Sequence, residues 1–293
     1  MPRTYRYRVV DVFTEKPLEG NPLAVFPEAD GVQPELMQKI AKELNLSETA
    51  FVLKAARADC VRKVRIFTPS REMEFAGHPT IGTAYVLLDE EVAPKGQFHL
   101  EENVGAVPIR VDDDGMIWLS TPPIRSVGTF SRESCAELSG LASADLLDNI
   151  TPEVLTAGNP NLYIAVRNKE LVDRAFVDTQ GLRRLRAKLD PLCVFVFTPT
   201  PEGAYSRMFA PEHGVVEDPA TGSATGPLAF FMRKHGLTTA AKFYSEQGTN
   251  MGRRSILHVE MRGEEIFVGG RVTPLVEALM KLPETGTDDI SAR

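Results

Sequence analysis

The feature that most restricts the fold of this chain is an internal duplication, because three short motifs occur twice in the same order. Each second copy lies about 140 residues after the first, so only the connecting loops differ in length. Three repeats in constant order indicate two related domains that face each other across a cleft. The pairs are Gly-Asn-Pro at 20–22 and 158–160, Arg-x-Phe-x-Pro at 65–69 and 207–211, and an acid followed by glycine at 74–78 and 217–223.

Both halves show the same succession of elements, judged from apolar alternation for strands and from helical apolar spacing for helices. In the first half we expect a helix at 36–44 and strands at 5–13, 23–26, 49–53 and 61–67. In the second half we expect a helix at 180–188 and strands at 161–166, 192–197 and 205–209. Hairpin strands are expected at 97–111 with 115–120, and at 255–262 with 265–272.

One helix in each half is expected to be buried, since its residues are apolar on nearly every face. These helices span 79–88 and 224–232, and each follows a glycine motif. We therefore expect an α+β protein with two pseudo-symmetric domains, each a curled mixed β-sheet around a central buried helix. The domains are placed at residues 1–120 and 121–282, and the polar tail 283–293 is expected to be disordered.

Composition excludes several other classes of protein. The 293 residues are 43% hydrophobic and 25% charged, with a net charge of -7. No basic tract is long enough to cover a phosphate backbone, so nucleic acid is not an expected partner. No apolar run is long enough to span a membrane, and the N-terminus lacks the apolar core of a signal peptide. Three scattered cysteines suit the reducing cytoplasm.

The two glycine motifs predict an anion site. If the buried helices start just after these motifs, Gly77-His78 and Gly222-Ser223 occupy helix N-termini. Amides at a helix start lack internal partners and carry the positive end of the helix dipole, so they bind carboxylates and other anions. The alternative is capping by Ser223 and Thr80, with water outside.

Three side chains are candidates for proton transfer. Glu48 lies between a helix end and an apolar strand, where partial desolvation would raise its pKa toward neutrality. The alternative is a surface glutamate at a turn. Asp218 precedes Pro219, where an Asx-turn is its commonest role. His78 directly follows a glycine and can act as acid, base or hydrogen-bond donor, or be purely structural.

Other chemistries find no support in the sequence. The remaining histidines do not pair with cysteine or carboxylate at a metal-ligand spacing, so no metal is expected. No nucleotide-binding glycine motif follows a strand, and no GxSxG elbow is present. No lysine suited to a Schiff base stands near either glycine motif.

Taken together, the motifs resemble those of the PhzF family of phenazine-biosynthesis isomerases. The resemblance spans residues 5 to 272, which is nearly the whole chain. It implies the diaminopimelate epimerase-like fold, with two similar domains and an active site between them. The motifs that carry it are residues 19–25, 45–51, 74–80 and 209–224, and the stretch 246–253.

The resemblance also implies a reaction. The founding activity is isomerisation of trans-2,3-dihydro-3-hydroxyanthranilate, a proton shift without metal or organic cofactor. Glu48 would be the acid/base, and His78 and Asp218 would orient the substrate or relay protons. In the epimerase branch two opposing cysteines exchange the proton, but here the glycine motifs carry His78 and Ser223, which argues against a two-thiol racemase. The residues expected to bind substrate are Asn21, Ser47, Gly77, Gly222 and Ser223.

The resemblance fixes the scaffold better than the substrate. An isomerase or epimerase of another small carboxylic or amino acid therefore stays open, as does a non-catalytic protein that binds a small acid. A pure binding protein has no need of a general base, so the set of Glu48, His78 and Asp218 favours an enzyme. Family members commonly dimerise, which implies a homodimer.

Overall fold

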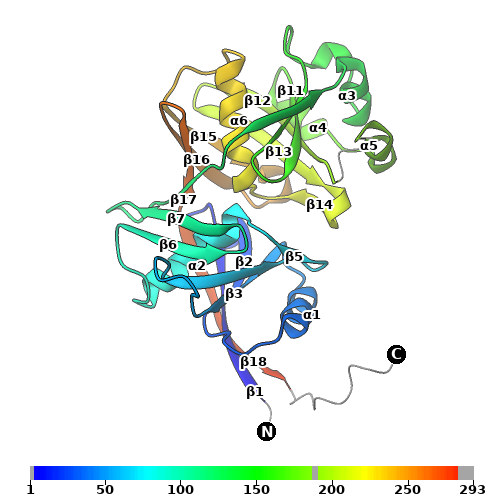
Figure 1. The fold of residues 1–293 in the computed structure, drawn as a ribbon. Coiled ribbons are helices and arrows are strands. Elements are labelled where there is room, and N and C mark those ends of the chain that lie inside the picture. Colours follow the sequence, from blue (N-terminus) through cyan, green and yellow to red (C-terminus); the bar gives the residue numbers. More distant parts are fainter. Residues whose placement is uncertain (1–2, 187–190, 283–293) are drawn as a thin grey trace.

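A computed structural model describes residues 3–186 and 191–282, which form two lobes stacked one above the other (Figure 1). The first lobe contains β1 (Arg3–Val12), β2 (Asn21–Phe26), α1 (Pro34–Leu44), β3 (Glu48–Leu53), β4 (Arg62–Phe67), β5 (Glu72–Met73), α2 (Gly77–Asp89), β6 (Gln97–Glu102), β7 (Gly105–Val111) and β8 (Ile117–Ser120).

The second lobe repeats this arrangement with additional short helices. Its elements are β9 (Arg125–Thr129), α3 (Arg132–Leu138), η1 (Ser143–Asp145), β10 (Glu153–Thr156), β11 (Pro160–Ala165), α4 (Lys169–Arg174), α5 (Thr179–Arg186), β12 (Cys193–Thr200), β13 (Gly203–Ala210), η2 (Pro211–His213), β14 (Val215–Asp218), α6 (Gly222–Lys234), β15 (Lys242–Gln247), η3 (Thr249–Met251), β16 (Ser255–Arg262) and β17 (Glu265–Gly270). The last strand of the described chain is β18 (Val272–Leu282).

The expected elements are confirmed, and the strand pairing shows the duplication directly. In the first lobe β2 pairs parallel with β3, and β4 with β6. In the second lobe the corresponding strands β11 and β12, and β13 and β15, also pair parallel. The helix expected at 180–188 is α5, whose last two expected residues lie outside the described part of the chain.

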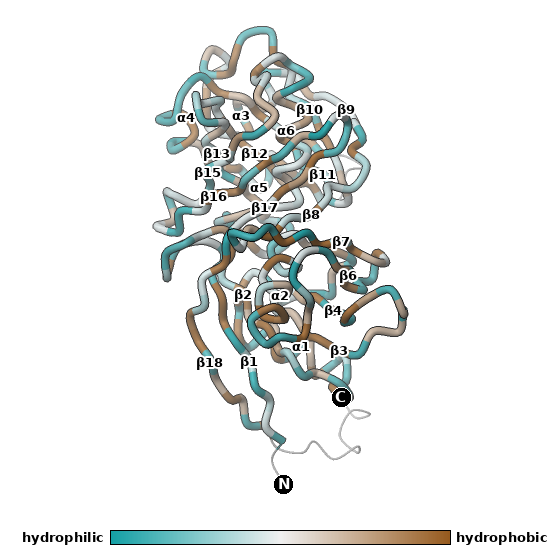
Figure 2. Tube along the Cα trace, turned by 90° about the vertical axis from the view of Figure 1, so that its left-hand side faces the viewer, coloured by the Kyte–Doolittle hydropathy of each residue, from teal (hydrophilic) through white to brown (hydrophobic). Residues whose placement is uncertain are grey.

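The two lobes share one mixed sheet. Strand β8 pairs antiparallel with β17, which joins the strands of both lobes into an 18-stranded sheet within the described residues. After β17 the chain returns to the first lobe, where β18 pairs with β1 along its whole length, from Arg3 opposite Leu282 to Val12 opposite Val272. Figures 1 and 2 both show these two strands side by side.

The pairing of β18 bears on how the chain divides into domains. It places residues 272–282 beside the N-terminal lobe, although they follow the second lobe in sequence. A division at residue 120 stays a prediction for the rest of the chain. The tail expected to be disordered, 283–293, lies outside the described residues.

Each lobe is organised around its buried helix, as expected for an α+β fold of this kind. In α2, Ile81 and Leu87 are fully buried against the strands of the first lobe. In α6, Leu228 and Phe231 pack among β11, β12 and β13. None of the helices in residues 3–186 and 191–282 combines the length and the apolarity needed to cross a bilayer.

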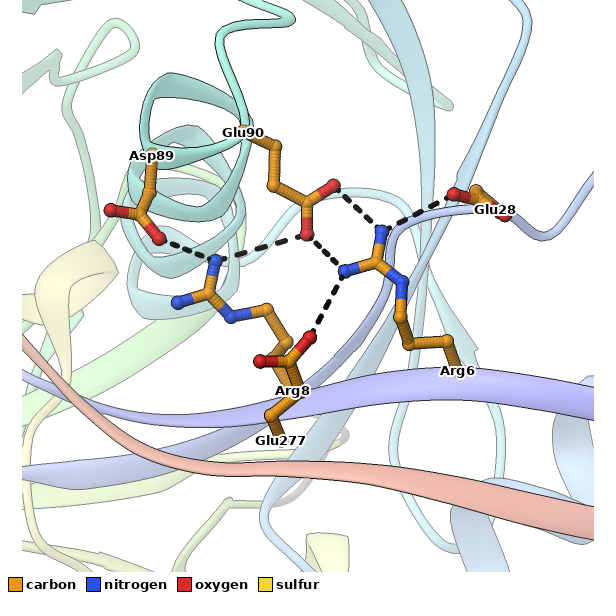
Figure 3. A network of polar contacts seen from close by, with 6 residues as sticks. All are labelled: Arg6, Arg8, Glu28, Asp89, Glu90 and Glu277. Carbon is orange, nitrogen blue, oxygen red and sulfur yellow. Dashed lines mark hydrogen bonds and ion pairs between the residues drawn. The ribbon is translucent and has the colours of Figure 1, made fainter.

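The C-terminal end of α2 is anchored by arginines of β1 (Figure 3). Asp89 and Glu90 are acidic residues at the negative end of the helix dipole, which is unfavourable unless cations compensate. Arg6 Nη1 lies 2.6 Å from Glu90 Oε1, and Arg8 Nη1 lies 2.7 Å from Asp89 Oδ2. Arg6 also contacts Glu277 of β18 at 3.6 Å. This network ties the helix to both strands of the β1–β18 ribbon.

The N-terminal ends of α2 and α6 meet in the middle of the molecule. A Cβ atom added at Gly77 would lie 3.1 Å from the backbone nitrogen of Ser223 and 3.2 Å from Cα of Gly222. Such distances are tighter than ordinary van der Waals contact, and the neighbouring atoms belong to the backbone. Glycine at position 77 therefore allows the two helix starts to touch.

We predict that Gly77→Ala lowers the free energy of unfolding by about 1–3 kcal/mol, because the added methyl group overpacks this contact. The measurement is denaturant unfolding of both wild type and variant. Gly128→Ala is the matched control, since a Cβ atom there meets nothing within 4 Å. Equal stability of the Gly77 and Gly128 variants would contradict the close contact.

Candidate active site

A cavity of about 70 Å³ lies where the two lobes meet. The first lobe contributes residues from the start of β3 and the start of α2, and the second lobe contributes residues from β11, β12, β14 and α6. Seven of the residues expected in the site line this cavity, namely Ser47, Glu48, Gly77, His78, Asp218, Gly222 and Ser223. The structure thus brings together side chains that are separated by more than half of the chain.

Both buried helices point their N-termini at the cavity. Helix α2 begins at Gly77 and α6 at Gly222, as expected from the sequence. Their N-cap residues, Ala76 and Thr221, make no side-chain capping hydrogen bond. Capping by Ser223 or Thr80 is not observed; the hydroxyl group of Thr80 instead donates to the carbonyl oxygen of Ala76. Two uncapped helix starts give the cavity a positive potential suited to an anion.

A chain of four polar side chains runs from the cavity into the interior. Oε2 of Glu48 lies 3.4 Å from Nε2 of His78. Behind His78, the Nδ2 atom of Asn21 lies 3.3 Å from His78 Nδ1, donates to Asp218 Oδ1 at 2.8 Å and donates to the carbonyl oxygen of Ala220 at 2.9 Å. The amide nitrogen of Asn21 faces Nδ1, which assigns the ring proton of His78 to Nε2, on the side of Glu48.

Burial changes the charge state of these groups. It raises the pKa of Glu48 well above its ordinary value, and the charge of Asp218 adds to this effect. It lowers the pKa of His78 to about 3, so the imidazole is neutral near pH 7 and its contact with Glu48 is not an ion pair. Burial also raises the pKa of Asp218 to about 6, although hydrogen bonds from Thr221 and Asn21 oppose the rise.

The end of β14, which carries Asp218, is held by two neighbours. The hydroxyl group of Thr221 donates to Asp218 Oδ2 at 2.5 Å. Gln247, at the end of β15, donates from Nε2 to the carbonyl oxygen of Asp218 at 2.7 Å and to the hydroxyl group of Thr221 at 3.0 Å. These contacts fix the direction of the Asp218 carboxylate.

Asn21 was expected to bind substrate, but it does not belong to the cavity wall. Its side chain is fully buried and its amide contacts His78 and Asp218 from behind. Gly20, directly before Asn21, has a backbone φ of +70°, and a Cβ atom there would lie 2.4 Å from the carbonyl oxygen of Val12. Glycine at position 20 therefore allows the turn that brings Asn21 behind the cavity.

The second lobe adds wall residues that sequence reasoning did not identify. They include Asn161 of β11, Cys193 of β12 and His213 of η2. Cys193 lies in none of the motifs. The duplication does single it out, because Cys193 occupies the position in β12 that Glu48 occupies in β3. Among the residues that the structure describes, no cluster of three or more His, Cys, Asp or Glu could hold a metal ion.

Comparison with known proteins shows which family this chain belongs to. The family model of phenazine biosynthesis-like proteins (PhzC-PhzF) matches residues 10–277. A trans-2,3-dihydro-3-hydroxyanthranilate isomerase from Pseudomonas aeruginosa is 37% identical over 264 residues, which cover 88% of this chain and 91% of that protein.

Solved structures agree on the fold. The PhzF-family phenazine biosynthesis protein of Bacillus anthracis is 25% identical, with a TM-score of 0.84 over 95% of this chain and 99% of that one. A hydroxyproline epimerase from Agrobacterium vitis, at 14% identity, has a TM-score of 0.62 over 96% of this chain and 93% of that one, which confirms the wider epimerase-like fold. The chain therefore belongs to the PhzF family of phenazine biosynthesis-like proteins and is an isomerase.

Proposed function

We propose that this isomerase moves a proton between carbon atoms of a small carboxylic acid and needs no cofactor. Its substrate would be similar to trans-2,3-dihydro-3-hydroxyanthranilate, after which the Pseudomonas aeruginosa relative is named. The observation that carries the proposal is the state of Glu48. Its carboxyl group lines the cavity, and its enclosed Oε2 atom has no hydrogen-bond partner within the described residues. A buried carboxyl group without a partner is available to a bound ligand.

The helix starts supply the anchor for the substrate. Amides at Gly77, His78, Gly222 and Ser223 surround the same cavity from two opposed helices. A substrate carboxylate bound there satisfies amides that the helices themselves leave unpaired. This contact holds the reacting carbon at a fixed distance from Glu48, so the entropic cost of orienting the substrate falls on binding and not on the chemical step.

Glu48 acts in two steps. Its carboxylate takes a proton from one carbon of the bound acid, and the electron pair of that C–H bond moves into the conjugated system. The resulting carboxylic acid then returns the proton to a second carbon, so no net charge is gained or lost. A raised pKa makes the carboxylate a stronger base than a solvent-exposed glutamate.

His78 and Asp218 support Glu48 rather than replace it. The Nε2 atom of the neutral imidazole lies 3.4 Å from Oε2 of Glu48, and within the described residues neither atom has a hydrogen-bond partner, so both are available to a bound substrate. Asp218 holds Asn21, and Asn21 in turn fixes the orientation of the His78 ring. Asn21 therefore positions the catalytic groups from behind, and Ser47 and Ser223 remain as hydroxyl groups that can contact the substrate.

Two further expectations belong to this proposal. A homodimer and a cytoplasmic location fit the family but stay predictions. A non-catalytic binding role is the alternative that the next experiment separates from catalysis.

We predict that Glu48→Gln lowers turnover of trans-2,3-dihydro-3-hydroxyanthranilate by at least about 10²-fold, the usual share of a general acid/base. The amide is isosteric, so the fold and the affinity for a product analogue should be retained. Turnover and calorimetric binding are measured in parallel. Glu43→Gln, the same substitution on an exposed position of α1, is the matched control and should keep full activity. Wild-type-like turnover in the Glu48 variant would remove this residue from the mechanism.

A second prediction concerns pH. Because the pKa of Glu48 is raised, its base form appears only well above its ordinary pKa of 4.5, and kcat/KM should rise with pH through that raised value. In Asp218→Asn a negative charge that raises this pKa is lost, so the pKa of Glu48 should fall. Carbon-13 NMR titration of the Glu48 carboxyl group measures both values. A midpoint near 4.5 in the wild type, or an unchanged midpoint in the variant, would contradict this account.

A further inference from the structure

The cavity wall contributed by the second lobe contains a polar pair at one level of two parallel strands. Asn161 of β11 lies directly opposite Cys193 of β12 in the strand register. Both residues are buried and both line the cavity. The next inward-facing residues on these strands, Tyr163 and Phe195, belong to the apolar core around α6. Asn161 and Cys193 therefore mark the point where the core of the second lobe ends and the cavity begins.

The duplication places this pair opposite the candidate acid/base. In the first lobe the same level of the equivalent strands holds Leu23 of β2 and Glu48 of β3. Asn161 therefore corresponds to Leu23, and Cys193 to Glu48, in two lobes that face each other across the cavity. Of these four residues Glu48, Asn161 and Cys193 line the cavity, whereas Leu23 packs in the apolar core of the first lobe. The second lobe thus has an amide at the level where the first lobe has only a core residue.

The side-chain amide of Asn161 has a fixed orientation. Its Nδ2 atom donates to the carbonyl oxygen of Asn159 at 2.9 Å. A carbonyl oxygen can only accept, so exchanging the nitrogen and oxygen of the amide would bring two acceptors together. The Oδ1 atom is thereby held away from Asn159.

That oxygen is enclosed and unsatisfied. Asn161 is 1% exposed, and within the described residues its Oδ1 atom accepts no hydrogen bond. Leaving a buried acceptor unpaired destabilises a protein, so such a group is expected where a bound molecule supplies the donor. Cys193 beside it is a weak donor and packs as a small apolar residue.

We infer that Asn161 is a substrate-binding residue, and that its Oδ1 atom accepts a hydrogen bond from a hydroxyl or amino group of the substrate. This inference rests on the proposed function and narrows its substrate class to small carboxylic acids that carry such a donor. The carboxylate binds at the helix starts, the reacting carbon faces Glu48, and the donor group faces Asn161. Because these three contacts lie on different walls of the cavity, a small cyclic substrate can bind productively in only one orientation.

The test compares ligands rather than activity alone. Binding of benzoate, 2-aminobenzoate and 3-hydroxybenzoate to the full-length protein is measured by calorimetry for wild type and for Asn161→Leu. Leucine has the same branching at Cγ as asparagine but no acceptor. Because leucine is the larger residue, Asn161→Ala is measured alongside it, since alanine cannot clash. Cys193→Ala, on the same wall, is the control that changes shape without removing the acceptor.

We predict that both Asn161 variants bind the best donor-bearing ligand about 3- to 10-fold more weakly, as expected for loss of one neutral hydrogen bond, and bind benzoate within twofold of wild type. Cys193→Ala should not discriminate among the ligands. Equal weakening of all three ligands, no weakening, or a wild type that binds neither donor-bearing acid more tightly than benzoate would each overturn the inference.

The two proposals fail in different ways. If the Asn161 variants discriminate as predicted while Glu48→Gln retains full turnover, the binding contact stands and the proton-transfer role of Glu48 falls. If Glu48→Gln is inactive and the Asn161 variants do not discriminate, the isomerase mechanism stands and the contact at Asn161 falls.

Discussion

The contact between the N-termini of α2 and α6 is the constraint on which the rest of the structure depends. Two positive helix ends meet at Gly77 and Gly222, inside the molecule and without side-chain caps. Such an arrangement is electrostatically unfavourable unless an anion binds between the helices. The continuous sheet and the arginine network at the far end of α2 hold the helices in this position (Figures 1 and 3). The fold therefore keeps two helix N-termini free for the substrate carboxylate that we propose binds between them.

The burial of this region also changes the ionisation of Glu48 and His78. With water excluded, the pKa of Glu48 rises and that of His78 falls, so a neutral imidazole lies beside a poised carboxyl group. Asp218 accepts hydrogen bonds from Asn21 and Thr221, and these oppose the rise that burial causes in its pKa. In the proposed mechanism the two carboxyl groups take different roles, because that of Asp218 is paired by Asn21 and Thr221 and that of Glu48 is left for the substrate.

Sequence reasoning reached the duplication, the two buried helices, His78 and Asp218 because these lie in or directly after motifs that recur. It reached Glu48 from its place between a helix end and an apolar strand. It did not identify Asn161 or Cys193, whose place in the wall depends on the register between two parallel strands that lie far apart in the sequence. The return of β18 to β1 was missed for a similar reason, since strand pairing between chain ends leaves no local pattern. Asn21 was found by its motif, but only the packing around Gly20 shows that it supports the site from behind.

Solvent deuterium incorporation during isomerisation of trans-2,3-dihydro-3-hydroxyanthranilate tests the central claim most directly. If a protein carboxyl group carries the proton, product formed in deuterated water should contain deuterium at the carbon that is newly protonated, as read by NMR and mass spectrometry. The label should be lost together with turnover in Glu48→Gln. Product formed without label, under conditions in which exchange of the Glu48 proton is faster than product release, would contradict transfer through this carboxyl group.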